Sequence, residues 1–548
     1  MLTDEQEAVA SSNANNLVVN AYAGSGKTST LVEYARRRPE ERLLYLAFNK
    51  AIKEEASNKF PRNVRCVTTH GLAFPSHGRL YQGKLGNPRA SHLARAIEID
   101  VISAGKALAV VTNYLSSVSR EINDSHAFAV APKGKAVMTG QLVDYARQAW
   151  AAMKTASSLA VPMPHDGYLK EYQLSNPTIN GVGKILFDEA QDANSVTLDI
   201  VQRQTCGKVF VGDSWQAIYS FRGAVNALSH INADERLHLT ASFRFGEGIA
   251  ALATALLTDW GNATKPVLGK GKHPTVFQVN RAAPHAVISR TNACLFQEAV
   301  RLLTVQVPFG FAGGVEGYRF DQILDAYYLF AKQRGKMRDQ FLAAFDSFDE
   351  MKKYGEALDD KEVKALVNAV EAYLHDIPML VDEIKARAIP NLTGQEVALA
   401  TTHKAKGLEW MDVVLCDDFT ELQEQPNDKG EMIPPDSEEI NILYVAMTRA
   451  MRGLAVPPKV EEWLAMRGTL HLIRPDAPAE QPQGAAATST PARPAAAPAV
   501  TDDLAARMRD LHDQLTGIYS LVRSTSPERA QEIAQYLHGH ANRFEKLQ

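Results

Sequence analysis

Residues 21–28 read AYAGSGKT and follow the apolar run Leu17–Val19, which predicts a buried strand. A helical pattern begins near Lys27. A strand, a loop of small residues and a helix that starts within GKT are typical of a phosphate-binding loop, because the loop N–H groups and the positive end of the helix dipole face the anion. Lys27 is expected to reach the β- and γ-phosphates, and the Thr28 hydroxyl to ligate Mg²⁺.

The match to the phosphate-loop pattern is imperfect, because Ala21 stands where the strict motif has glycine. A glycine-containing turn before a helix is the alternative interpretation, and the flanking strand and the GKT triplet favour the phosphate loop. The residues expected to surround the phosphates are Ala21, Tyr22, Ala23, Gly24, Ser25, Gly26, Lys27 and Thr28.

The bulk composition limits the class of protein. The chain has 548 residues, of which 45% are hydrophobic and 22% charged, which predicts several packed domains. The formal net charge of −4 gives no overall basic field, so contact with nucleic acid must come from a local groove. The four cysteines are scattered, without metal-ligand spacing, and no apolar run reaches membrane-spanning length. A soluble, intracellular (cytoplasmic) protein in a reducing compartment is expected, with neither a disulfide framework nor a structural zinc.

Apolar strand-like runs alternate with helical patterns in two parts of the chain, which predicts parallel sheets covered by helices. The expected strands are Leu17–Asn20, Leu43–Phe48, Val64–Thr68, Lys184–Phe187, Lys208–Val211, Val287–Arg290, Val397–Ala400 and Val413–Cys416. The expected organisation is a first α/β domain (1–74 and 181–238) with a helical insertion (75–180), a second α/β domain (239–300 and 389–470) with a short helical insertion (301–388), an Ala/Pro-rich linker (475–501) and a helical hairpin (502–548). The hairpin is either self-contained or a docking module for a protein partner.

A pair of carboxylates follows the expected strand Lys184–Phe187. Asp188 and Glu189 open the stretch DEAQD, directly after an apolar run. In a chain that already has GKT, Asp188 is expected to hold Mg²⁺, and Glu189 to orient and deprotonate the attacking water. An exposed acidic pair at a strand end is the alternative.

Residues 209–223 read VFVGDSWQAIYSFRG. Together with GKT and DEAQD, this stretch resembles the superfamily 1 DNA helicases of the UvrD/Rep/PcrA type. Four further motifs of that family occur in order, at residues 2–6, 239–244, 401–410 and 438–450. The resemblance covers residues 1–460 and implies an α/β fold of two RecA-like P-loop domains with parallel sheets, each with a mainly helical insertion, followed here by a short helical tail.

The resemblance also implies roles for residues of the nucleotide site. Gln6 would read adenine, and Phe243 would place its ring against the base. Arg244 and Arg449 would face the γ-phosphate from the second domain, so the site would be complete only when the domains close. Further roles implied by the motifs fall to Gln216, as reporter of the γ-phosphate, and to Glu409, near the ribose.

A track for single-stranded DNA needs rings for base stacking and donors for phosphates. The candidates are Phe48, Asn49, Lys50, Thr69, His70, Tyr219, Phe221, Arg222 and His403. Phe48 could equally be a core residue, because the family places its ring one residue earlier, at Ala47. Lys406 could contact the strand backbone or be solvated.

Finer details are similar to the F-box DNA helicases, namely Tyr22, the strand end AFNK, HDGYLK at 165–170 and SFRFG at 242–246. The sequence before Leu2 is too short for an F-box, so a ubiquitin-ligase role is not carried over. The resemblance implies an ATP- and Mg²⁺-dependent translocase and 3′→5′ helicase on single-stranded DNA and its junctions with duplex. The alternatives left open are a translocase that strips proteins from DNA with little unwinding and an ATP-gated DNA-binding subunit of a larger repair or defence complex.

Overall fold

The computed structural model describes residues 2–474, apart from 129, 131–135, 221–225, 227, 229–230, 340, 358–359 and 427–430. These residues belong to one compact unit, which spans residues 1–482. The predicted linker (475–501) and hairpin (502–548), and the candidate DNA-binding residues Phe221 and Arg222, lie outside the described residues.

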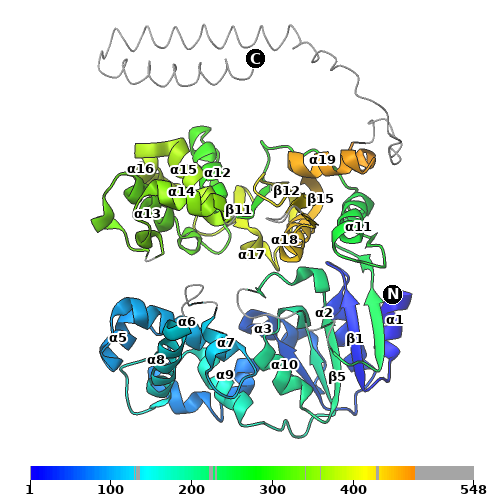
Figure 1. Cartoon of the computed structure of the whole chain (residues 1–548). Coiled ribbons are helices and arrows are strands. Elements are labelled where there is room, and N and C mark those ends of the chain that lie inside the picture. The colour runs from blue at the N-terminus through cyan, green and yellow to red at the C-terminus, as the bar shows by residue number, and fades with distance from the viewer. Residues whose placement is uncertain are drawn as a thin grey trace, which may run out of the picture. The chain divides into compact units, whose positions relative to one another are not determined.

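The first sheet has six parallel strands in the order β3-β2-β4-β5-β1-β6, of which β1 and β5 are labelled in Figure 1. Its strands are β1 (Asn16–Ala21), β2 (Leu43–Ala47), β3 (Val64–Thr68), β4 (Lys184–Phe187), β5 (Gly207–Gly212) and β6 (Glu235–Leu239). Every residue of β2, β4 and β5 is buried, which explains their continuous apolar runs.

Helices cover both faces of the first sheet. Leu17 and Val19 of β1 pack on one face, and Val18 packs on the other, as the alternation of a strand requires. The first face is covered by α1 (Asp4–Ser11), α2 (Lys27–Arg36) and α3 (Lys50–Lys59), and the second contacts α10 (Ser195–Gln202).

A helical insertion with its own core separates β3 from β4. It contains α4 (Thr69–Ala73), η1 (Gly78–Lys84), α5 (Ala90–Ile97), α6 (Val101–Ser116), α7 (Asp124–Ala127), α8 (Ala136–Lys154) and α9 (His165–Leu174). Two short 3₁₀ turns, η2 (Ala190–Asp192) and η3 (Ser214–Gln216), follow β4 and β5.

The second sheet has five parallel strands in the order β10-β11-β9-β12-β15. They are β9 (Ala286–Ser289), β10 (Phe309–Phe311), β11 (Val397–Thr401), β12 (Trp410–Leu415) and β15 (Ala450–Ala455). One face packs on α11 (Glu247–Trp260), α18 (Ser437–Met447) and α19 (Pro458–Met466), and α17 (Thr402–Ala405) follows β11. Two small two-stranded sheets pair β7 (Ala241–Ser242) with β8 (Leu268–Gly269) and β13 (Gln425–Pro426) with β14 (Met432–Ile433).

A second helical segment connects β10 to β11 and shares a core with the other face of the second sheet. This face also packs on α12 (Asn292–Thr304), and the segment comprises η6 (Val315–Tyr318), α13 (Asp321–Phe330), η7 (Arg334–Lys336), η8 (Leu342–Ala344), α14 (Phe348–Ala357), α15 (Lys361–Tyr373), η9 (Leu374–Asp376) and α16 (Ile377–Arg387). The chain then ends its described part in η10 (Leu470–Leu472).

The predicted α/β class with two parallel sheets is confirmed, and all eight expected strands are present. The expected start of the second insertion at residue 301 is wrong, because Phe309–Phe311 forms strand β10 of the second sheet. The three residues of this strand are too few to show a strand period, and the Gly313-Gly314 pair follows closely, so the sequence pattern suggests a loop there. None of the described helices is both long and apolar enough to span a bilayer.

Candidate functional site

The loop between β1 and α2 forms a cradle whose backbone turns through two glycines. Gly24 and Gly26 have φ angles of +73° and +79°, which favour glycine, and a Cβ on Gly24 would lie 2.6 Å from Ser242 Oγ. The buried Ser25 Oγ has no hydrogen-bond partner in the part of the chain that the structure describes. Ala21 replaces the motif glycine without strain because it is the last residue of β1 and pairs with Leu239. This cradle, with an unpaired buried hydroxyl, fits a bound phosphate.

Asp188, directly after β4, lies beside the start of α2. Its Oδ2 accepts hydrogen bonds from Thr28 Oγ1 at 3.1 Å and from the Tyr45 hydroxyl at 2.8 Å. Burial and the neighbouring Glu189 raise the pKa of Asp188 to about 6. A cation would favour the ionised form, and the adjacent oxygens of Thr28 and Asp188 are donors that suit Mg²⁺. The structure therefore brings the two predicted metal-holding residues together.

Glu189 lies next to Lys27, with its Oε2 at 3.8 Å from Lys27 Nζ, and accepts from Gln191 Nε2 at 2.7 Å. Although burial opposes ionisation, Lys27 and Lys406 hold the pKa of Glu189 below its usual value. Its backbone has φ +51°, a left-handed conformation that is rare outside glycine. Glu189 is thus an ionised carboxylate at neutral pH, as a general base must be.

Two arginines from the second α/β domain, Arg244 and Arg449, approach this loop. A Cβ on Gly24 would lie 2.7 Å from Arg244 Cβ, and Arg244 itself pairs with Glu409 at 2.8 Å. Arg449, which follows α18, is 1% exposed. Its guanidinium donates to Val445 O at 2.9 Å, to Leu408 O at 3.3 Å and to Thr448 Oγ1 at 3.4 Å.

No carboxylate is among the partners of Arg449 that the structure describes. Burial and the like charge of Arg244 lower the pKa of Arg449 to about 9. A buried cation whose hydrogen-bond partners are all neutral is costly, and an anion at the phosphate loop would relieve that cost. A buried positive charge of this kind suits a site for the γ-phosphate.

The two residues predicted to contact the base, Phe243 and Gln6, lie in different surroundings. Phe243 is 46% exposed and donates its N–H to Gly24 O at 2.9 Å, so its ring is free to face a ligand. Gln6 uses its amide within the protein, accepting from Thr3 N at 3.1 Å and donating to Ser25 O at 3.2 Å. Tyr22 is buried and stacks on Trp215 with ring centroids 5.1 Å apart. Tyr22 thus supports the loop by packing in the hydrophobic core.

The second half also reaches the phosphate loop through Tyr444 of α18, a residue that the sequence analysis did not single out. The Tyr444 hydroxyl of α18 accepts from the Ala23 N–H at 3.1 Å and donates to Asp213 Oδ2 at 3.1 Å. Gln216 donates to the same Asp213 oxygen at 2.8 Å. Lys406, after α17, bonds Asp192 at 2.6 Å and Gln216 O at 2.5 Å. A tyrosine within an apolar helix is a weak signal of such a role, since its buried hydroxyl needs a partner.

Most of the predicted DNA-contacting residues that are described lie near the carboxylates of Asp188 and Glu189. A pocket of about 230 Å³ is lined by both kinds of residue: Phe48, Thr69, His70 and Tyr219, and also Asp188 and Glu189. Phe48 is 42% exposed and its ring stacks with that of Tyr219, with centroids 6.1 Å apart. The exposure of Phe48 argues against a core role, and the shared pocket puts candidate DNA contacts beside Asp188 and Glu189.

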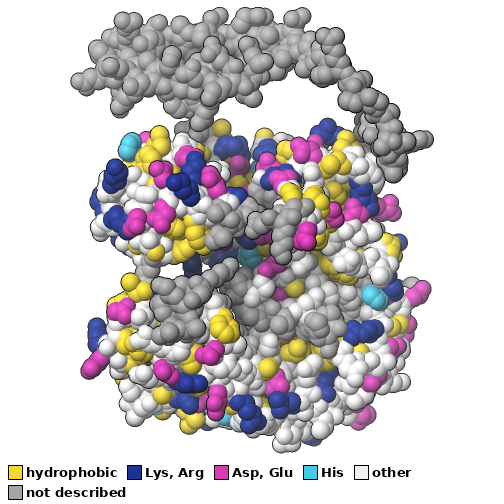
Figure 2. Space-filling view, viewed as in Figure 1, with side chains coloured by type: hydrophobic (Ala, Val, Ile, Leu, Met, Phe, Trp, Pro, Cys, Tyr) yellow, Lys and Arg dark blue, Asp and Glu magenta, His cyan; other side chains and the backbone are white. Residues whose placement is uncertain are grey.

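The other candidates for DNA contact have partners within the protein. His403 is close to Ile218 O at 3.0 Å, and Lys406 lies over the Tyr219 ring at 4.9 Å from its centroid. Asn49 caps α3 by accepting from Ile52 N, and the exposed Lys50 pairs with Glu54. On the face shown in Figure 2, Lys/Arg and Asp/Glu side chains are interspersed rather than gathered in one basic area. Attraction of a strand would therefore depend on such local groups.

Comparisons with known proteins agree with this geometry. Residues 107–235 match the UvrD/REP helicase N-terminal domain, and residues 320–457 match the UvrD-like helicase C-terminal domain. F-box DNA helicase 1 of Gallus gallus is 33% identical over 513 residues, which cover 86% of this chain and 50% of that protein. F-box DNA helicase protein 1 of Schizosaccharomyces pombe is 30% identical over 516 residues, covering 85% and 58%. The chain thus spans only a little over half the length of these curated relatives.

Proposed function

Because this chain belongs to the UvrD-like helicase family and carries both its N- and C-terminal domains, we propose that it is an ATP-driven DNA helicase. In this proposal it translocates on single-stranded DNA and separates strands in the 3′→5′ direction, hydrolysing ATP with Mg²⁺ between its two sheets. The observation that carries the proposal is the convergence of both halves on one phosphate loop: Lys27 and Glu189 from the first, Arg244 and Arg449 from the second.

The residues present account for the steps of hydrolysis. The loop amides and Lys27 would bind the phosphates of ATP, and Thr28 with Asp188 would hold Mg²⁺. Mg²⁺ supplies neutralisation of phosphate charge when bound. Glu189 would take the proton of the attacking water. Arg449 and Arg244 would stabilise the charge that develops on the γ-phosphoryl group, an effect of about 10³–10⁵ in rate for a supplied arginine.

Coupling to DNA would run through the segment that follows β5. Gln216 and Tyr219 belong to this segment, and both contact groups of the second half: Gln216 O accepts from Lys406, and the Tyr219 hydroxyl donates to His403 O at 3.3 Å. Opening of the cleft after hydrolysis would move His403 relative to Tyr219 and Phe48, which both lie on the first half. Such a change of the stacking surfaces would shift a bound strand.

The deciding experiment measures ATP turnover of the full chain with single-stranded DNA, duplex DNA and RNA, and strand displacement on duplexes with a 3′ or a 5′ tail. We expect stimulation by single-stranded DNA and displacement of the 3′-tailed duplex. Lys27→Ala should lower turnover about 10²-fold or more, because a phosphate-facing cation is lost. DNA-stimulated turnover without displacement would support a protein-stripping translocase instead, and turnover unaffected by Lys27→Ala would refute the assignment of the site.

Tyr45→Phe is expected to raise the Mg²⁺ concentration for half-maximal activity about 10-fold, because the Tyr45 hydroxyl orients the carboxylate that would hold the ion. The measurement is a Mg²⁺ titration of nucleotide binding and of ATP turnover. Tyr34→Phe is the matched control, since Tyr34 is also buried in this half and its hydroxyl accepts from Lys184 at 2.9 Å. Equal Mg²⁺ dependence in both variants would contradict the orienting role.

A further inference from the structure

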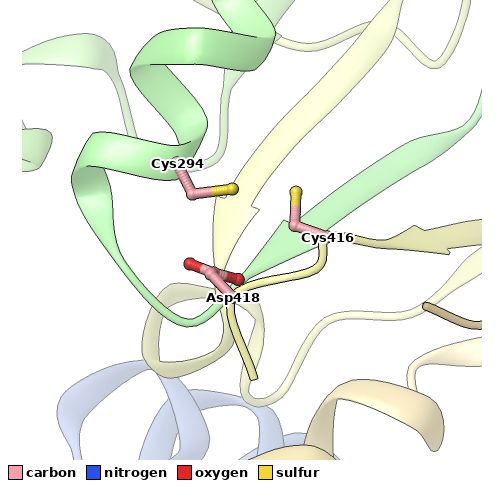
Figure 3. A group of neighbouring side chains, drawn as sticks. All are labelled: Cys294, Cys416 and Asp418. Atoms are coloured by element: carbon pink, nitrogen blue, oxygen red, sulfur yellow. The ribbon is translucent and has the colours of Figure 1, made fainter. Parts of the chain in front are cut away.

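A group of metal-ligating side chains lies in the second half of the molecule, apart from the nucleotide site. Cys294 belongs to the first turn of α12, Cys416 follows β12 directly, and Asp418 comes two residues later. The two Sγ atoms and a carboxylate oxygen of Asp418 all lie within 4.8 Å of one another. Figure 3 shows the three side chains directed into the same space between the helix and the loop. All three are partly exposed, so an ion from solvent could reach them.

The backbone holds these three groups in place. Asp418 accepts from the N–H groups of Arg290 and Thr291 at 2.9 and 2.8 Å, and from Thr291 Oγ1 at 2.9 Å. Thr291 also caps α12 by accepting from Cys294 N at 3.2 Å, and Cys416 N bonds Ile288 O at 2.9 Å. Three bonds fix the carboxylate before any ion arrives, and its oxygens keep lone pairs that the three donors do not use.

We propose that Cys294, Cys416 and Asp418 form a binding site for a thiophilic divalent cation, of which Zn²⁺ fits best. Two thiolates and a carboxylate are three of the four ligands of a tetrahedral zinc site, and water can supply the fourth at this partly exposed position. Zinc–sulfur bonds of about 2.3 Å place tetrahedral ligand atoms roughly 3.8 Å apart. The ligand atoms, which lie within 4.8 Å of one another, therefore need to approach by about 1 Å.

Metal binding accounts for this pair better than a disulfide does. Both cysteines are free thiols in the structure, and the Asp418 carboxylate, which a disulfide would leave unused, lies among the same ligand atoms. A bound Zn²⁺ displaces the proton of a coordinating thiol outright. Binding would convert two thiols to thiolates and release two protons to solvent, with no change of oxidation state and no added reactant.

The site has a mechanical link to the helix that leads to Arg449. Asp418 holds the backbone of Arg290, whose guanidinium pairs with Glu439 of α18 at 2.9 Å. Glu439 also pairs with Lys361 of α15 at 3.0 Å. An ion that ties α12 to the end of β12 would stiffen this connection, so we expect occupancy to stabilise the second half of the protein.

The test uses the full chain, purified under reducing conditions, with excess Mg²⁺ to fill oxygen-ligand sites. Zinc content is measured by elemental analysis and native mass spectrometry, and Co²⁺ substitution reports thiolate ligation through its charge-transfer absorption. The chain provides two matched controls, because Cys66 and Cys206 are also partly exposed thiols. We expect one ion per chain in the wild type and in Cys66→Ser and Cys206→Ser.

Cys294→Ser and Cys416→Ser should each lower the affinity at least about 10-fold and remove both the thiolate absorption and the rise in melting temperature with Zn²⁺. These readouts need neither ATP nor DNA, so their failure is distinct from failure of the proposed helicase activity. The proposal would be overturned if the Cys294 and Cys416 variants bound zinc as the wild type does, or if the wild type bound none at micromolar Zn²⁺. It would also be overturned if protein purified under reducing conditions still contained a Cys294–Cys416 disulfide.

Discussion

Arg449→Ala is expected to lower DNA-stimulated ATP turnover about 10³-fold or more, while the chain still binds nucleotide. The wild-type guanidinium is buried and held by two carbonyls and a hydroxyl, so it is positioned before the γ-phosphoryl charge develops. A group that acts mainly in the transition state changes kcat more than it changes ground-state binding. The measurement pairs steady-state phosphate release with the Kd of a fluorescent nucleotide.

Two further variants distinguish a loss of catalysis in Arg449→Ala from a loss of the fold. Arg449→Lys keeps the charge and most of the volume but lacks the planar fork, so it should also turn over slowly. Arg452→Ala is the matched control, since Arg452 lies on β15, the strand that follows Arg449, and its guanidinium pairs with Asp412. It should retain nearly full turnover, because Asp412 has no proposed role in ATP hydrolysis. An Arg449→Ala protein that loses nucleotide affinity with kcat intact would contradict the role.

Glu189→Gln is expected to slow the chemical step about 10²–10⁴-fold, the usual range for loss of a general base. The amide keeps the shape of the side chain but cannot take a proton from water. Because a negative charge near the γ-phosphate is removed, nucleotide affinity should be unchanged or higher. Single-turnover hydrolysis with the nucleotide prebound isolates this step from binding and release.

Glu461→Gln provides the control for this change, because Glu461 is a carboxylate of α19 that pairs with Arg474, away from the loop. Its turnover should equal that of the wild type. Wild-type hydrolysis by Glu189→Gln would show that another group accepts the proton. The neighbouring Asp192, which is bound to Lys406, would then be the first residue to replace.

The part of the site that the sequence could predict is the part with local geometry. The carboxyl ends of parallel strands lie at one edge of a sheet, so a loop after β1 and a carboxylate after β4 had to come together. Lys27, Thr28, Asp188 and Glu189 each carry a short-range signature of that kind. The pairing of the two halves around Arg449 came from a family resemblance, since no local pattern places an arginine against a loop more than 400 residues away.

The contacts that the sequence could not predict depend on register between distant segments. Tyr45 reaches Asp188 across 143 residues, and Tyr444 reaches Ala23 across 421. Both tyrosines sit in apolar runs that read as ordinary core. Cys294 and Cys416 also lack metal-ligand spacing, and only the order of β9 and β12 as neighbours brings them together. The sequence did not predict the short strand β10, because the strand is defined by its pairing with β11 and is too short to show the two-residue period of a strand.

The left-handed backbone of Glu189 has a consequence for how variants of this protein should be judged. An L-residue in that conformation costs on the order of 1–3 kcal/mol, and glycine would avoid most of it. A library selected for heat resistance would therefore enrich glycine at position 189 and discard the carboxylate proposed to serve as base. Variants at position 189 would therefore be ranked in one order by melting temperature and in the opposite order by ATP turnover.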